Sequence, residues 1–112
     1  MKLTVLKKQL PEPPETFLRH AGYAYLQSWE GGQDSFVRRL TRDFYPRFHL
    51  YFSLEKDART GEETVVFNLH LDQKKPGYAG FSRHNGEYDG PVVEAEAARL
   101  KSLLPPDFFS AL

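Results

Sequence analysis

The clearest pattern in the chain is an alternation of apolar and polar residues in two neighbouring segments, 47–55 and 64–72. The apolar positions are Phe48, Leu50, Phe52 and Leu54 in the first segment and Val65, Phe67, Leu69 and Leu71 in the second. Because successive side chains of a β-strand point to opposite faces, both segments predict strands with one buried face. The polar stretch 56–63 between them predicts the turn of a hairpin.

The two apolar faces of the hairpin coincide when even-numbered residues of the first segment lie opposite odd-numbered residues of the second. Centring the turn between Arg59 and Thr60 pairs residues whose numbers add to 119, as 59 and 60 do. The polar pairs on the other face are then His49 with His70, Arg47 with Asp72, and Tyr51 with Asn68. Directly opposite side chains lie close enough to interact, so this face is a candidate binding surface.

Shorter patterns predict the other elements. Residues 2–8 and 23–29 favour strands, and residues 11–22 favour a helix that begins at prolines and ends at Gly22. In residues 91–104, four apolar residues recur at helical spacing and predict a C-terminal helix of about 91–104. The segment 73–91 contains four glycines and no sustained period, which predicts a long loop.

Residues 34–43 fit two interpretations. Apolar residues between positions 36 and 44 make a helical stripe, whereas the glycine pair at 31–32, between two aromatic and β-branched segments, is typical of a hairpin. We favour the strand. Arg38 and Arg39 then point to opposite faces of the sheet, so one of them must be paired, extended to the surface or bound.

Together these elements predict an α+β fold in a single domain, residues 1–112. The architecture that we expect is a two-layer sandwich, in which a small antiparallel sheet carries an N-terminal and a C-terminal helix on one face. A chain of 112 residues with 40% hydrophobic content suffices for one modest core. The polar face of the hairpin would then lie opposite the helices, where a binding site can be built.

Charge and cysteine content indicate which partners and which cellular compartment we expect for the protein. Fifteen basic residues balance fifteen acidic ones, so no net charge attracts the chain to nucleic acid or to an anionic membrane. The balance is uneven, because residues 1–50 carry eight basic and five acidic side chains and residues 51–112 carry seven and ten. The chain has no cysteine and no apolar run as long as a signal peptide or membrane span requires, so we expect a cytoplasmic protein.

Three phrases of the sequence, "YPRFHLY", "FNLHLDQKKP" and "GEYDG", span roughly residues 45–90. They resemble phrases in short uncharacterised proteins predicted from bacterial genomes. The resemblance implies a bacterial-type cytoplasmic chain and carries no activity, cofactor or catalytic residue with it. The sequence also contains no phosphate-binding glycine loop, no His-Glu-x-x-His motif and no RNA-recognition consensus.

The predicted polar face suits single-stranded nucleic acid. Its candidate ligand-binding residues, with two lysines that follow the second strand, are Arg47, His49, Tyr51, Asn68, His70, Asp72, Lys74 and Lys75. Aromatic rings stack on unpaired bases and basic side chains neutralise phosphates, to which Arg38 or Arg39 would add. The plainer interpretation is a solvated face on which Arg47 pairs with Asp72. We predict a small non-enzymatic binding module, with nucleic acid as its first candidate partner.

A metal-assisted hydrolytic site is another interpretation of the same histidines. His49 and His70, joined by His84, Glu87 and Asp89 from the long loop, are side chains that hold metals or transfer protons. No spacing among them matches a recognised ligand pattern, and Asp89 fits a helix cap equally well. The prediction is therefore a face without a catalytic residue, a metal or a cofactor.

A protein partner or self-association is the third interpretation. Aromatic residues anchor many interfaces, and the candidates are Tyr23, Tyr25, Trp29, Phe108 and Phe109. In so small a chain the core claims most aromatic side chains, so none of these residues alone indicates a partner. A protein partner therefore ranks second to nucleic acid, and no membrane partner is expected.

Overall fold

The computed structural model describes residues 1–28, 33–73, 86–87 and 90–105 of the chain. The elements are β1 (Lys2–Leu6), the 3₁₀ turn η1 (Lys7–Gln9), α1 (Pro14–His20), β2 (Ala24–Leu26), β3 (Ser35–Arg39), β4 (Arg47–Lys56), β5 (Glu63–Asp72), β6 (Gly86–Glu87) and α2 (Pro91–Ser102). The protein is therefore α+β, with an antiparallel sheet and two α-helices among the described residues.

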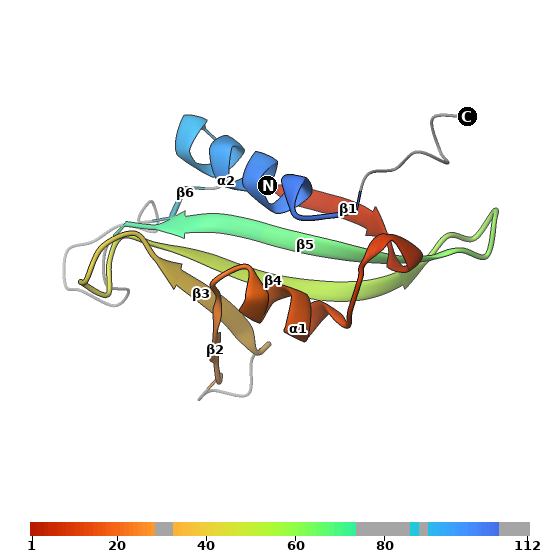
Figure 1. The fold of residues 1–112 in the computed structure, drawn as a ribbon, viewed down its shortest axis with the longest axis horizontal. Helices are drawn as coiled ribbons and strands as arrows, with labels where there is room; N and C mark the ends of the chain where they lie inside the picture. Colours follow the sequence, from red (N-terminus) through yellow and green to blue (C-terminus); the bar gives the residue numbers. More distant parts are fainter. Residues whose placement is uncertain (29–32, 74–85, 88–89, 106–112) are drawn as a thin grey trace.

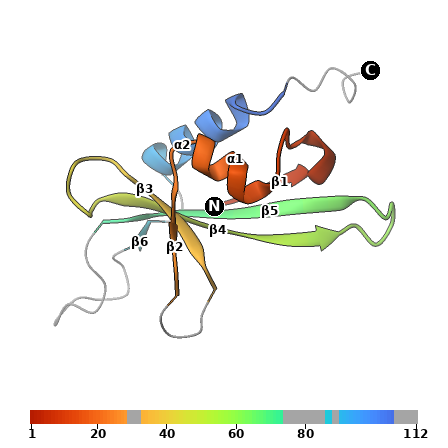
Figure 2. The ribbon, with the colours of Figure 1, turned by 60° about the horizontal axis from the view of Figure 1, so that its bottom comes forward.

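The sheet is built around the long hairpin of β4 and β5 (Figure 1). The strand order is β1-β5-β4-β3-β2, and the short β6 pairs with the last two residues of β5. The β2–β3 hairpin extends away from the β4–β5 ribbon in both views (Figures 1 and 2). Because β3 pairs only with Arg47–Leu50 of β4, the second half of β4 has β5 as its one described neighbour.

The predicted register of the β4–β5 hairpin is confirmed. Leu50 lies opposite Leu69 and Arg47 opposite Asp72, and every pair of this ladder adds to 119. The turn is fixed locally, because the Asp57 side chain accepts hydrogen bonds from the backbone N–H groups of Arg59 and Thr60. Gly61 follows with a φ of +75°, a conformation that favours glycine.

The ambiguous segment 34–43 forms a strand over Ser35–Arg39, as favoured, and not a helix. Phe36 pairs with Leu50 and is only 3% exposed, so the strand buries its best apolar residue in the core. Leu40 and Phe44, which a helical stripe would have buried, are 41% and 62% exposed. Packing of β3 against β4 therefore decided between the two patterns.

The core contains apolar residues from both helices and from the sheet. Phe17 and Leu18 of α1 and Val93, Ala97 and Leu100 of α2 are buried with Leu3, Phe36, Phe48, Leu50, Val65, Phe67, Leu69 and Leu71. The predicted core is correct except at the far end of β4. There Phe52 is only partly buried and Leu54 is 61% exposed, because β3 does not extend beside this part of β4.

The buried carboxylate of Glu96 connects α2 to Tyr23 and to Arg38 of β3. Arg38, which was expected to be paired, extended to the surface or bound, is therefore paired. Glu96 accepts a hydrogen bond from the Tyr23 hydroxyl at 2.6 Å and from two nitrogens of Arg99 at 2.8 and 2.9 Å, and Arg38 lies 3.4 Å away. Arg99 also donates to the carbonyl of Ala21. Burial alone would raise the pKa of Glu96, but its bonds to Arg99 and Tyr23 outweigh burial and lower it.

The segment 73–91, predicted as one long loop, contains the two-residue strand β6, and residues 74–85 and 88–89 lie outside the described part. The C-terminal helix begins at Pro91 as predicted and ends at Ser102, two residues before the expected end. No described helix combines the length and the apolar character needed to cross a bilayer.

Candidate functional site

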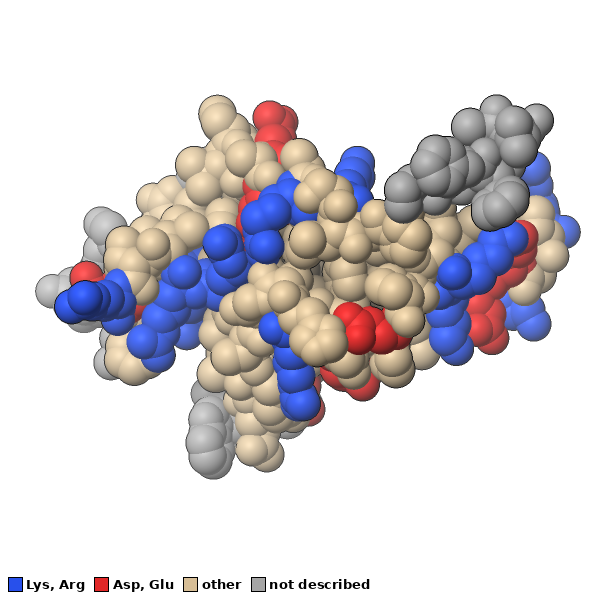
Figure 3. All heavy atoms as spheres, viewed as in Figure 1, with Lys and Arg blue, Asp and Glu red and all other residues tan. Residues whose placement is uncertain are grey.

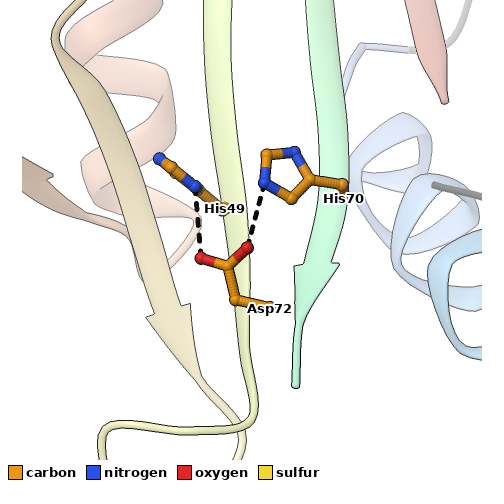
Figure 4. A group of neighbouring side chains, drawn as sticks. All are labelled: His49, His70 and Asp72. Atoms are coloured by element: carbon orange, nitrogen blue, oxygen red, sulfur yellow. Dashed lines mark ion pairs between the residues drawn. The ribbon is translucent and has the colours of Figure 1, made fainter. Parts of the chain in front are cut away.

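The register of the central hairpin brings two histidines and one aspartate together. His49 and His70 are direct cross-strand partners, and Asp72 follows His70 by two residues, on the same face of β5. Asp72 is therefore the diagonal neighbour of His49. Figure 4 shows the Asp72 carboxylate between the two imidazole rings, with one oxygen directed to each ring.

The distances define a compact cluster, which we call the His-His-Asp cluster: His49, His70 and Asp72. Nδ1 of His49 lies 3.2 Å from Oδ2 of Asp72, and Nε2 of His70 lies 3.0 Å from Oδ1. The two rings meet edge to face with their centroids 4.7 Å apart. One side-chain ligand atom from each of the three residues lies within 4.8 Å of the other two.

Two neighbouring residues hold this cluster in place. Ser35 of β3 places its Oγ 2.7 Å from Nε2 of His49, the ring nitrogen that faces away from Asp72. Arg47 donates from Nε to Oδ2 of Asp72 at 3.2 Å, and its guanidinium lies 4.6 Å from the centre of the Tyr45 ring. Both oxygens of Asp72 and both nitrogens of His49 therefore have partners.

Burial and charge make Asp72 the anion of this site. Its side chain is 13% exposed, as are those of Arg47 and His70, whereas His49 is 24% exposed. Burial by itself would raise the pKa of Asp72, but the hydrogen bonds and charges of His49 and His70 outweigh it and hold the pKa well below its usual range. Asp72 is consequently ionised throughout the neutral pH range.

Of the sequence-predicted ligand-binding residues, the structure brings together Arg47, His49, His70 and Asp72. Tyr51 and Asn68 form the next cross-strand pair on the same face, and both are half-buried. Lys74 and Lys75 lie outside the described residues, as do His84 and Asp89. Glu87 belongs to β6, but its side chain is not among the described ones.

The sequence interpretation missed Ser35. The β3–β4 ladder pairs residues whose numbers add to 86, such as Phe36 with Leu50, which sets Ser35 diagonal to His49 on the polar face. That register could have been derived once residues 35–39 were taken as a strand, by matching Phe36 to an apolar position of β4. The prediction would then have placed Ser35 beside His49 on the polar face.

Among the aromatic residues proposed as interface anchors, Tyr23 is buried in the core at 3% exposure. Tyr25 is 47% exposed, and its hydroxyl is hydrogen-bonded to the carboxylate of Asp34. Trp29, Phe108 and Phe109 lie outside the described residues. A protein partner stays a prediction for this chain.

The geometry of the His-His-Asp cluster fits a divalent transition-metal ion. Ligand bonds of about 2.0–2.1 Å in a tetrahedral arrangement place neighbouring ligand atoms about 3.3 Å apart. The two nitrogen–oxygen distances of 3.0 and 3.2 Å are already near that value. Because the two contacts are to different oxygens of Asp72, binding of one ion requires rotation of the side chains, which now hold one ligand atom each within 4.8 Å of the others.

Comparison of the chain with models of known protein families, with curated proteins and with solved structures found no match.

Proposed function

We propose that this protein binds a divalent first-row transition-metal ion, with Zn²⁺ as the first ion to test, through His49, His70 and Asp72. The observation that carries the proposal is the placement of Nδ1 of His49 and Nε2 of His70 within 3.2 Å of the two oxygens of one ionised carboxylate. Imidazole nitrogen and carboxylate oxygen are ligands that zinc and non-haem iron sites both use. This proposal replaces the expectation of a metal-free face.

The hydrogen bond between His49 and Ser35 supports the proposal. Metal-ligating histidines usually donate their second ring N–H to an oxygen, which fixes the tautomer and the orientation of the ring. Nε2 of His49 lies 2.7 Å from Oγ of Ser35 and Nδ1 faces Asp72, so when an ion displaces the proton of Nδ1, Nε2–H can donate to Oγ and Nδ1 supplies the lone pair. The ring is then in the tautomer that coordination requires.

Three protein ligands leave one position of a tetrahedral ion for water or for a ligand from solution. Arg47 opposes binding of the ion, because its positive charge lies 3.2 Å from a ligand oxygen and repels a cation bound there. We expect the ion to replace part of the interaction between Arg47 and Asp72. The affinity is consequently set by a competition between the metal and a guanidinium for the same carboxylate.

The two-layer arrangement expected from the sequence belongs to the same proposal. Core residues of both helices pack with the even-numbered side chains of β4, and the His-His-Asp cluster includes an odd-numbered residue of that strand. Figure 2, in which α1 and α2 lie over one side of the sheet, supports helices on one face and the metal site on the other. Ion binding then requires no rearrangement of the helices.

Calorimetric titration and thermal unfolding with Zn²⁺ test the proposal. An ion at one hundred times its dissociation constant stabilises the folded state by about 2.7 kcal/mol, which raises the melting temperature of a domain this size by roughly 10 °C. We expect His70→Ala and Asp72→Asn to abolish this rise. Binding must weaken as the pH falls, because protons compete with the metal for both imidazoles.

His20 provides the matched control. It is a histidine on α1 whose side chain is 71% exposed and which pairs with Glu12, away from the sheet. His20→Ala should retain the full zinc-induced stabilisation. A wild-type protein with no change in melting temperature at millimolar zinc, or a change that His70→Ala and Asp72→Asn leave intact, would rule out the site.

A further inference from the structure

The connection between β3 and β4, with the strand ends beside it, carries a second group of residues, none of which is a proposed metal ligand. We call it the arginine–aromatic cluster: Arg39, Phe44, Tyr45 and Arg47. Arg39 is the direct cross-strand partner of Arg47, so two guanidinium groups leave the same face of the sheet side by side. Like charges in directly opposite positions repel each other. The arrangement therefore favours an anion at this end of the sheet.

The two arginines differ in how their charge is balanced. Arg47 is 13% exposed and pairs with Asp72. Arg39 is exposed and takes part in no ion pair with a described residue, although its guanidinium lies 4.1 Å from the centre of the Phe44 ring. Among the described residues of this cluster, the positive charge without an acidic partner thus lies on Arg39, beside an aromatic ring.

Phe44 is the most exposed large apolar residue that the structure describes, at 62%. An exposed phenylalanine next to a guanidinium offers two features that unpaired nucleotides use together. The ring and the guanidinium plane stack with a base, and the guanidinium N–H groups contact a phosphate. A base within a duplex cannot reach such a ring without leaving its stack, so the pair selects for single strands.

Further basic residues lie near the arginine–aromatic cluster. Arg42, in the same connection, is exposed. On the helix side, Arg38 and Arg99 share the single carboxylate of Glu96 and keep about a third of their side chains exposed, at 33% and 34%. Figure 3 shows basic side chains in a nearly continuous band from the end of the molecule near the β3–β4 connection to α2.

From these observations we infer that the arginine–aromatic cluster is a binding surface for single-stranded RNA or DNA. A base stacks on Phe44, the adjacent phosphate contacts Arg39, and the arginine band follows the backbone of the next nucleotides. The inference extends the predicted nucleic-acid-binding function but moves its centre from the half-buried hairpin face to the β3–β4 connection. It does not depend on the metal site.

Fluorescence anisotropy with a labelled twelve-nucleotide oligouridine, and with the DNA equivalent, tests the surface. Phe44→Leu keeps an apolar side chain but removes the ring, and should weaken binding about 5- to 100-fold without changing the salt dependence. Arg39→Gln removes a phosphate contact, and should lower the slope of log affinity against log salt concentration by about 0.7. Both positions are exposed, so the melting temperature should not change.

The opposite end of the molecule supplies matched controls. Leu54 is an exposed apolar residue on β4, at 61%, and Lys8 is an exposed cation that pairs with Glu62. Leu54→Ala and Lys8→Gln should leave oligonucleotide binding unchanged. Absence of binding at tens of micromolar protein in low salt would overturn the inference. So would duplex binding as tight as single-strand binding, or binding that a sulfated polyanion matches and Phe44→Leu leaves unchanged.

Discussion

Ser35 and His49 are joined across β3 and β4 by a 2.7 Å contact between Oγ and Nε2, while Nδ1 of the same ring faces Asp72. One imidazole therefore links a buried hydroxyl to a buried carboxylate, and its orientation is fixed from both sides. Ser35 is only 5% exposed, so this contact is shielded from solvent. The pair determines which nitrogen of His49 is available to the proposed metal.

Removal of the Ser35 hydroxyl should loosen the proposed metal site. In Ser35→Ala, His49 loses the hydroxyl that contacts its Nε2, and loss of such a partner of a metal-binding histidine typically weakens metal binding by about 10- to 100-fold. Competition with a chromophoric zinc chelator measures the effect. Ser53→Ala is the control, because Ser53 lies further along β4 and its hydroxyl donates to Glu55. Equal zinc affinities for Ser35→Ala and wild type would show that Ser35 plays no part.

Arg47→Gln should have the opposite effect. The substitution removes a positive charge that lies 3.2 Å from a ligand oxygen of Asp72. A nearby unit charge at an effective dielectric constant of about 20 contributes a few kcal/mol, and about 1.4 kcal/mol is a factor of ten, so zinc should bind at least tenfold more tightly. Calorimetric titration distinguishes this outcome from a purely structural role, in which loss of Arg47 would weaken binding. Arg59→Gln, in the exposed hairpin turn, should not alter the affinity.

The sequence was sufficient to predict the centre of this site but not its surroundings. The alternation required even-numbered residues of one strand opposite odd-numbered residues of the other, and centring the turn between Arg59 and Thr60 put His49 beside His70. Ser35 was not predicted, because its segment fitted both a helix and a strand until packing against Leu50 decided the matter. The position of Asp72 between both rings depends on side-chain rotamers, which an alternation pattern does not specify.

The buried contacts of Glu96 with Tyr23, Arg38 and Arg99 were not predicted, for a different reason. Glu96 lies three residues after Val93 and four before Leu100, on the same side of α2 as the predicted apolar stripe. A carboxylate in that position must be exposed or paired, and the sequence gives no distance to Arg38 or Tyr23, which precede it by 58 and 73 residues. Arg99, three residues away on the same helix, was the partner within reach of sequence reasoning.

Loss of the Glu96 carboxylate should destabilise the fold. Glu96→Ala leaves Arg99, Arg38 and the buried Tyr23 hydroxyl without their common partner, and breaking a buried ion pair costs about 3 kcal/mol or more. Urea unfolding followed by circular dichroism gives the free energy of unfolding. Glu94→Ala changes an exposed acid two residues earlier on the same helix and should cost less than about 0.5 kcal/mol. Similar losses of unfolding free energy in the two variants would show that the buried contacts of Glu96 do not stabilise the fold.

The core prediction is tested by two leucines of the central hairpin. Leu69 is 1% exposed, and cutting it to alanine should cost about 2–5 kcal/mol because the surrounding side chains cannot fill the cavity. Leu54, which the alternation places on the same face, is 61% exposed, so Leu54→Ala should change the free energy of unfolding little. A large loss for Leu54→Ala in the same urea experiment would contradict the position of β4 at an open edge.

Acid unfolding provides a test of Asp72 in which no metal is needed. Because the folded protein holds the pKa of Asp72 well below its usual value, folding favours the ionised form, and the resulting stability is complete above about pH 4. That stability is lost as the pH falls below 4 towards the lower folded-state pKa, since the unfolded chain then binds the proton more readily.

In wild type, the melting temperature should therefore decrease steeply between about pH 4 and pH 2. Asp72→Asn removes this titration, so its melting temperature should be lower than wild type at neutral pH and should decline less on acidification. Glu96, whose pKa is also lowered, keeps some acid sensitivity in both proteins. Glu94→Gln, which changes an exposed acid of α2, is the control. Parallel profiles for Asp72→Asn and wild type would mean that the two histidines do not stabilise the Asp72 carboxylate.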